Sequence, residues 1–331
     1  MTPPPSDRPR SSRLALPMLL LVTLIWGGTF VWMKDAVGAA EAEALARGLD
    51  PDQALTTAIL AFLFARFGMA AVGLPLIAPR LIPVVAGRAE GGRIAWRGGA
   101  SLGALLIAGF ILQMFALAEV SAPVSAFLTS FYVGFTALIL AARQRRWPNR
   151  WTLAGVALAS FGAGFIDGPP QVSFGWPEIL TLISAAIFAV TILVTDKITK
   201  AAPPVAVSWV TFVTVATAAG TALALWPIDG VSSVWEWFGL LLELPAYRNG
   251  LLLCGLLATL GALTLINIFQ REVEPVRAAI LYALEPVWAA VWAVFLQAET
   301  LGTWLWIGGS ALLLGNLLAE LAPKRAHSSS T

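Results

Sequence analysis

The sequence predicts an all-α membrane protein with ten transmembrane helices, built as two inverted five-helix repeats. Four observations indicate this fold. Hydrophobic residues make up 58% of the 331 residues and charged residues only 12%, whereas soluble domains average roughly 25% charged residues. Apolar stretches of the length that crosses a bilayer recur along the chain. Positive charges gather between alternate stretches, and the two halves of the chain align with each other.

Ten stretches are long and apolar enough to be spans. They are continuously apolar rather than alternating, so they predict helices and not the strands of a barrel. The first is longer than the roughly 7–15-residue core of a signal peptide, which favours a retained span; VGAAEA just downstream leaves a cleavage site as the alternative. The expected spans are 14–33, 57–78, 98–118, 122–142, 151–167, 176–195, 205–226, 250–270, 276–296 and 302–321.

The distribution of Lys and Arg orients these spans. With the N-terminus in the cytoplasm, the segments on that side carry 17 Lys and Arg residues and the external segments carry 3. This positive-inside bias predicts a multi-pass protein with both termini cytoplasmic, residues 1–13 as a disordered tail and 322–331 as a second tail. Outside, AAEAEALARGL is expected to form a short helix, and SSVWEWFGLLLEL to lie in the membrane interface.

The chain also contains an internal repeat. A shift of 153 residues aligns 119–166 with 272–319 without a gap and gives nine identities in 48 positions. The repeats are expected at 14–167 and 176–321. Because each holds five spans, an odd number, the second must be inserted upside down relative to the first. Inverted repeats are typical of secondary transporters, whose substrate site lies near the midplane where the repeats meet.

Four segments resemble a known family. TLIWGGTFVWMK, SAFLTSFYVGFTALIL, VRAAILYALEPVWAAVWAVFL and WIGGSALLLGNLLAEL resemble EamA-type members of the drug/metabolite transporter (DMT) superfamily. The resemblance extends from Leu14 to Leu321. It implies a ten-helix, two-repeat carrier that exports small metabolites such as amino acids across the bacterial inner membrane. Two features depart from the family: Val133 stands where many members carry Pro, and RQRRWPNR replaces an acidic end.

Two ionisable residues lie near the middle of spans, Arg66 in the second and Glu285 in the ninth. Such groups are costly in a membrane and are functional candidates by default. Pro286 removes a backbone donor and frees the carbonyl of Tyr282. We therefore expect Glu285 to bind substrate or a coupling proton. The alternative is a structural carboxylate satisfied by neighbouring donors, with Arg66 among them.

Polar side chains in the other spans complete the candidate site. The repeat offset places Tyr132 opposite Glu285 and Thr129 opposite Tyr282. Two spans carry stripes of hydroxyl groups on one face, namely Ser125, Thr129, Tyr132 and Thr136, and Thr181, Ser184, Thr191 and Thr195. The candidate substrate-binding residues are Glu285, Tyr282, Tyr132, Thr129, Gln113, Asn267 and Trp26, with Arg66 as a coupling or structural charge. Ordinary hydrogen bonding or packing between helices is the alternative for each of them.

The composition argues against several other classes of protein. The lone Cys254 and lone His327 leave no disulfide framework and no metal site. No GxxxxGK[ST] loop and no pair of intramembrane carboxylates is present, so we expect no cofactor, no catalytic residues and no enzyme. The net charge of +2 is too small to suggest nucleic acid. The prediction is an exporter of small amino-acid-like or amphipathic solutes. A non-transporting scaffold or sensor is the alternative, and proton coupling and homodimerisation are open.

Overall fold

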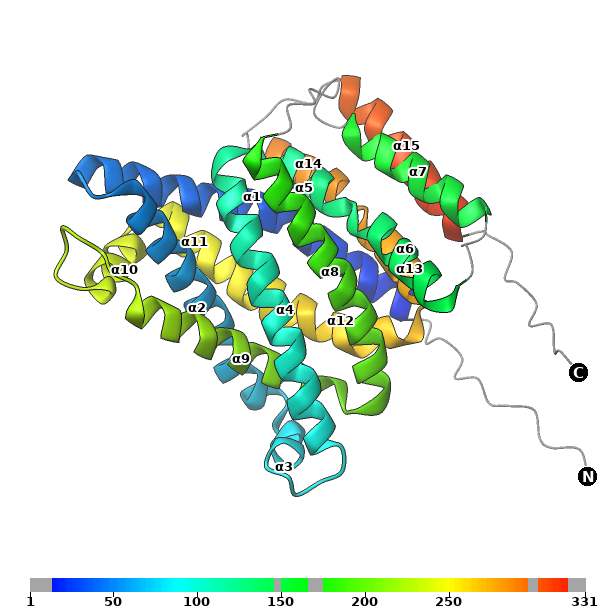
Figure 1. Cartoon of the computed structure of the whole chain (residues 1–331), viewed down its shortest axis with the longest axis horizontal. Helices are drawn as coiled ribbons and strands as arrows, with labels where there is room; N and C mark the ends of the chain where they lie inside the picture. The colour runs from blue at the N-terminus through cyan, green and yellow to red at the C-terminus, as the bar shows by residue number, and fades with distance from the viewer. Residues whose placement is uncertain (1–13, 146–149, 166–174, 297–302, 321–331) are drawn as a thin grey trace, which may run out of the picture.

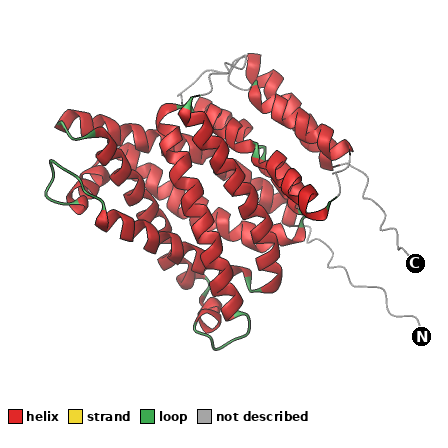
Figure 2. Ribbon diagram, in the orientation of Figure 1, coloured by secondary structure: helices red, strands yellow, loops and turns green. Residues whose placement is uncertain are grey.

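The computed structural model describes residues 14–145, 150–165, 175–296 and 303–320 (Figure 1). Within these ranges every regular element is helical, as the sequence predicts (Figure 2). The two predicted tails, 1–13 and 322–331, lie outside the described residues. The elements in chain order are α1 (Ala15–Arg47), α2 (Pro51–Ile77), η1 (Pro79–Leu81), α3 (Ile82–Val85), α4 (Gly92–Glu119), α5 (Ala122–Ser130), α6 (Tyr132–Gln144), α7 (Arg150–Gly164), α8 (Trp176–Ala201), α9 (Pro204–Leu225), α10 (Val234–Glu243), α11 (Pro245–Leu253), η2 (Cys254–Leu263), α12 (Thr264–Phe269), η3 (Gln270–Glu272), α13 (Pro275–Tyr282), α14 (Glu285–Phe295) and α15 (Thr303–Glu320).

Eight helical segments in the described part of the chain are long and apolar enough to cross a membrane. Two of them, Val124–Gln144 and Pro275–Phe295, each combine two consecutive helices, and Pro245–Glu272 combines four elements. The eight coincide with eight of the expected spans. At the fifth and tenth expected spans the structure has α7 and α15, which pack against each other at one edge of the bundle (Figure 1). Ten spans stays a prediction for these two helices.

The elements begin at positions that repeat the spacing found in the sequence. Pro204 of α9, Pro245 of α11, Pro275 of α13 and Thr303 of α15 start helices that follow their counterparts by 153 residues. Those counterparts are α2, α4, α5 and α7. The spacing therefore extends well beyond the aligned segment, to four helix starts in each half.

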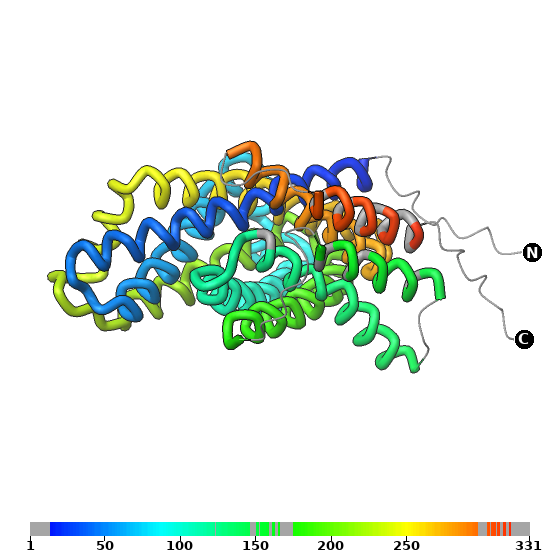
Figure 3. Tube along the Cα trace, turned by 90° about the horizontal axis from the view of Figure 1, so that it is seen from above, coloured from blue at the N-terminus to red at the C-terminus, as the bar shows by residue number. Residues whose placement is uncertain are grey.

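The first helix is longer than one span requires. α1 has 33 residues, about 50 Å at 1.5 Å per residue, and it runs along most of the length of the bundle (Figure 3). The separate external helix expected at AAEAEALARGL is wrong, because these residues continue α1 to Arg47. No proline stands between the two segments, and the alanine and glutamate residues that follow favour the helix, so it continues through Gly38.

A tight turn then joins α1 to α2. Gly48 has φ of 64° and ends α1 in the left-handed conformation that glycine adopts without a steric cost. Asp50 caps α2, and its side chain accepts a hydrogen bond from the backbone N–H of Gln53 at 2.8 Å. Pro51 follows as the first helical residue. Three residues thus reverse the chain direction.

The main core lies where α2, α4 and α9 pack against one another and α1 packs on α11. α10, in the segment expected at the membrane interface, buries Trp237 completely and packs on α2. The indole nitrogen of Trp237 donates to the carbonyl of Ala54 at 3.2 Å. Elsewhere α1 packs closely on α14 and α8 packs on α5 and α6. These contacts leave a cavity between the helices of both halves.

Candidate functional cavity

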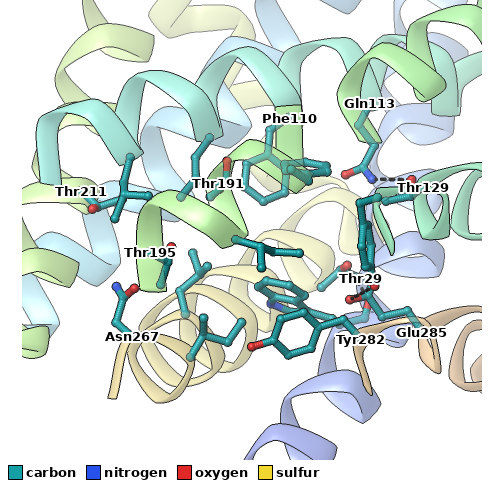
Figure 4. A pocket seen from close by; sticks show the side chains of 18 of the residues that line it. Thr29, Phe110, Gln113, Thr129, Thr191, Thr195, Thr211, Asn267, Tyr282 and Glu285 are labelled. Atoms are coloured by element: carbon teal, nitrogen blue, oxygen red, sulfur yellow. Dashed lines mark hydrogen bonds between the residues drawn. The ribbon is translucent and has the colours of Figure 1, made fainter. Parts of the chain in front are cut away.

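A cavity of about 820 Å³, its open mouth included, lies among the helices of the bundle. The lining is mostly apolar with a few polar groups, as in small-molecule sites. Every candidate residue from the sequence lines it: Trp26, Arg66, Gln113, Thr129, Tyr132, Asn267, Tyr282 and Glu285. Figure 4 shows polar side chains at both ends, with Gln113, Thr129 and Glu285 at one and Asn267, Thr195 and Thr211 at the other.

Two interrupted helices contribute the side chains at one end. In the second half, α13 ends at Tyr282 and α14 begins at Glu285. Pro286 explains this break, because its ring prevents a continuous helix and suits the first turn of a new one. In the first half, α5 ends at Ser130 and α6 begins at Tyr132. No proline stands at the break between α5 and α6, so the sequence did not predict it.

Glu285 is buried, with an exposed fraction of 4%. Its Oε1 accepts a hydrogen bond from the hydroxyl of Tyr132 at 3.4 Å, which is long for an O–H···O bond and therefore weak. The ion pairs Glu43–Arg47 and Asp196–Lys200 do not involve Glu285. Within that part of the chain Glu285 thus has no cationic partner, and the alternative in which Arg66 neutralises it is not observed.

Arg66 is more deeply buried, with an exposed fraction of 1%. Its Nε donates to the hydroxyl oxygen of Thr259 at 2.5 Å, and one terminal nitrogen lies 3.5 Å from the sulfur of Met33. The guanidinium carbon lies 4.6 Å from the ring centroid of Phe110, within cation–π range. No carboxylate of the described chain pairs with this guanidinium. The cavity therefore contains two buried ionisable side chains, one basic and one acidic, each without an ionic partner among the described residues.

Other candidate side chains connect neighbouring helices while they line the cavity. The amide nitrogen of Gln113 donates to the hydroxyl of Thr129 at 3.1 Å, and this bond is drawn in Figure 4. The amide nitrogen of Asn267 donates to Ser208 Oγ at 2.8 Å. These bonds fit the expected helix–helix role, and each amide still faces the cavity. A part in substrate binding stays a prediction for both.

The aromatic candidates form one wall of the cavity. The rings of Trp26 and Tyr282 lie 6.0 Å apart between centroids. The hydroxyl of Tyr282 donates to Oε1 of Gln270 at 3.0 Å, and the amide nitrogen of Gln270 donates to the carbonyl of Ile192 at 2.8 Å. Gln270 is not among the residues predicted from the sequence. Its only signal was a polar side chain at the end of an apolar span, like that of Asn267.

The two hydroxyl stripes only partly face the cavity. Thr191 and Thr195 line it, together with Thr29 and Thr211, which the sequence analysis did not identify. Thr181 and Ser184 instead donate to carbonyls of their own helix. Ser125 and Thr136 are fully buried outside the cavity, and their hydroxyl groups have no partner among the described residues. Residues on one face of a helix can therefore line the cavity at one level and pack against other helices at another.

Comparison with known proteins adds a family to this geometry. Residues 175–320 match the model of the EamA-like transporter family. The C-terminal half is an EamA-like transporter domain. The chain is accordingly a multi-pass membrane protein with an EamA-like domain, and Glu285, Tyr282 and Asn267 belong to that domain, whereas Arg66 and Trp26 precede it.

The solved structures bear on the fold of the whole chain. Of 24 solved chains that match, one crystal structure of a protein superposes with a TM-score of 0.66 at 16% identity, over 95% of this chain and 98% of that one. Such low identity supports the fold alone. No curated protein matches the chain. The match in fold therefore extends over the first half as well as the EamA-like domain, while the substrate is left to be inferred from the cavity.

Proposed function

We propose that the protein is a secondary transporter that moves a small metabolite through the central cavity by alternating access. The observation that carries the proposal is the presence of two buried, oppositely charged side chains, Arg66 and Glu285, in one cavity without a direct ion pair. Arg66 comes from the first half and Glu285 from the EamA-like domain. In this proposal residues 14–167 and 176–321 are inverted repeats, and the site lies where they meet.

The same two charges suggest the substrate class. A buried charge without a partner costs several kcal/mol, and a bound zwitterion would supply a partner to each. The guanidinium of Arg66 suits a carboxylate, because its planar fork matches two oxygens. The carboxylate of Glu285 would then accept from an ammonium group. Aromatic and aliphatic side chains between the two ends, such as Phe110 and Ile266, would contact the apolar part of an amino-acid-like solute.

Glu285 also gives the transporter a means of coupling to protons. When an ammonium group leaves the cavity, the buried carboxylate loses its only cation and needs another positive charge. A proton would satisfy that need at the same oxygen atoms. The proposal is therefore an exchange of substrate for a proton at Glu285. Export is the proposed direction, as in the family that the chain resembles, with both termini in the cytoplasm.

The first test is metabolite profiling of culture medium from cells that express the wild type, Glu285→Gln or an empty vector. We expect one or more amine-bearing acids to accumulate with the wild type only, because the amide cannot carry the charge that an ammonium group needs. The same compound should exchange across proteoliposomes that contain the wild type, and an imposed pH gradient should drive its net flux. Glu243→Gln, an exposed carboxylate at the end of α10, is the matched control and should behave as the wild type.

The outcomes separate the functions under consideration. Wild-type protein that neither changes the medium nor exchanges any solute in vesicles would contradict transport and favour a scaffold or sensor. Equal accumulation with Glu285→Gln would keep the transporter and remove Glu285 from its mechanism. A solute flux that does not change with the imposed pH gradient would indicate a uniporter rather than a proton-coupled transporter.

A further inference from the structure

The eighth span contains an unusual helical segment beside the cavity. Cys254–Leu263 is π-helical over ten residues, although π-helices are rare, mostly a single turn long and frequent at functional sites. The hydroxyl of Thr259 donates to the carbonyl of Cys254 at 2.8 Å. These two residues are five apart, which is the hydrogen-bond spacing of a π-turn. The wide turn is thus stabilised by the side chain of Thr259 as well as by the backbone.

The same hydroxyl oxygen accepts the Nε–H of Arg66 at 2.5 Å. Thr259 is fully buried and does not line the cavity, whereas Arg66 does. The hydroxyl group donates its one proton to the carbonyl of Cys254, and its oxygen accepts the hydrogen bond from the guanidinium. Thr259 therefore contacts the cavity only through Arg66.

Ala258, next to Thr259 in the chain, also binds a side chain of another span. The indole nitrogen of Trp26 donates to the carbonyl of Ala258 at 3.3 Å. Trp26 also lines the cavity. Two consecutive residues of the π-helical segment therefore hold two cavity-lining side chains, one from α1 and one from α2. A regular α-helix here would turn Ala258 and Thr259 away from Trp26 and Arg66. The wide turn and these two contacts therefore depend on each other.

We infer that Thr259 is a positioning residue that orients the guanidinium of Arg66 to read an anionic group of the transported solute. This inference rests on the proposed function. Holding Nε through Thr259, with the guanidinium beside Phe110, restricts rotation of the guanidinium. One terminal nitrogen contacts only the weakly accepting sulfur of Met33, so the terminal nitrogens can bind a ligand carboxylate. Pre-organisation of this kind raises affinity by reducing the entropy lost on binding.

The test compares two probes that differ by one carboxylate, L-leucine and its decarboxylated analogue 3-methylbutylamine. Their apparent affinities are measured on the full chain in detergent, from the ligand concentration that gives half-maximal thermal stabilisation. The wild type should prefer leucine, and Thr259→Val should lower that preference about tenfold, the effect of losing one hydrogen bond to a charged group. Thr259→Ser keeps the hydroxyl and should restore most of the preference.

A matched control and a double mutant separate positioning from general damage. Thr57 is as buried as Thr259, but its hydroxyl donates to a carbonyl of its own helix and it does not line the cavity. Thr57→Val should therefore keep the wild-type preference. In Arg66→Gln the added Thr259→Val change should have no further effect on the ratio of the two affinities, because the two residues act as one unit.

The inference is overturned if folded Thr259→Val keeps the full preference for leucine, or if Thr259→Ser loses as much of it as the valine variant. A wild type that does not distinguish leucine from the amine would also overturn it, by removing the anion-reading role of Arg66. Failure of the proposed function has a different signature, namely wild-type proteoliposomes that exchange no solute. Transport with an unchanged ratio in Thr259→Val would leave the function standing and reject Thr259 alone.

Discussion

The two interrupted helices of the cavity, α5–α6 and α13–α14, have the same backbone form and different chemistry. Each breaks in the middle of a span, and the first residues after the breaks, Tyr132 and Glu285, are 153 residues apart and share a hydrogen bond. One break carries a carboxylate and the other a phenol. The site is thus symmetric in its scaffold and asymmetric in its charge.

The cause of each break also differs between the two helices. Pro286 is the second residue of α14, and Val133 is the second residue of α6. A proline is therefore not required for the interruption. Near the first break the Ser130 hydroxyl donates to the carbonyl of Phe127 at 2.7 Å, a local bond of the kind that competes with helical ones. Tertiary contacts across the cavity, such as Gln113 to Thr129, supply further stabilisation.

Exchanging the two residues is the sharpest test of this comparison. Glu285→Tyr alone should lower transport about 100-fold, because it removes the carboxylate that faces an ammonium group. Adding Tyr132→Glu restores a carboxylate on the opposite side of the same gap. We expect the double variant to recover at least part of the exchange rate in proteoliposomes.

The single change Tyr132→Phe is the control for that exchange. It removes only a long hydrogen bond, so transport should stay within about threefold of the wild type. A correctly folded double variant as inactive as Glu285→Tyr would show that the two positions are not interchangeable, and that the carboxylate works only from α14.

The next largest effect concerns the packing that supports the second break. A Cβ atom on Gly27 would overlap the Cβ of Trp288 and lie 2.8 Å from the backbone nitrogen of Ala289 and 2.9 Å from the carbonyl oxygen of Glu285. Gly27→Ala should therefore separate α1 from α14 and destabilise the fold by about 1–3 kcal/mol, as overpacking does. Thermal unfolding in detergent measures this loss.

Gly38 in the same helix is the matched control. Nothing lies within 4 Å of a Cβ built there, so Gly38→Ala should leave stability unchanged or raise it by up to about 1 kcal/mol through helix propensity. Equal effects of the two substitutions would contradict the close approach of α1 to α14. The residue 153 positions after Gly27 is Leu180 in α8, so this glycine contact belongs to one half only.

The smallest effect should come from moving the proline between the two breaks. Pro286→Ala should cost less than about 1 kcal/mol, because α5–α6 breaks without a proline. Val133→Pro should be tolerated to a similar degree, since the first turn of a helix has no need of that N–H group. Both changes are measured as shifts in thermal unfolding together with the rate of exchange.

Ala104→Pro, in the middle of the continuous helix α4, provides the contrast. It should destabilise the protein by about 3 kcal/mol or more. If Val133→Pro proved as damaging as Ala104→Pro, α5 and α6 would be one continuous helix and the comparison between the two breaks would fail.

Much of this architecture follows from patterns in the sequence. Apolar runs predicted the helices, and polar residues inside those runs predicted the cavity lining, because such side chains avoid lipid and gather where they find partners. This reasoning identified Arg66 and Glu285, and in the structure both line the same cavity. Pro286 predicted the second break, since its chemistry acts locally.

The features that could not be predicted depend on contacts between distant segments. The break at Phe131 has no proline, and the π-helical turn at Thr259 forms within a sequence that also suits an α-helix. Arg66 donates to the hydroxyl of Thr259, 193 residues away in the chain, and no local sequence pattern predicts this pairing. The continuation of α1 to Arg47 does not follow from the apolar pattern, because that pattern ends where charged residues begin, although these residues also suit a helix.

The short turn at Gly48–Asp50 has a mechanical consequence. Because only three residues join α1 to α2, we expect little independent motion of the two helices where they meet. The side chains of Trp26 and Arg66 are also attached to the π-helical segment of the other half. We expect these three elements to move as one rigid body during transport. The sliding boundary would then run along α5, α6 and α8, and the moving unit would combine helices from both halves of the chain.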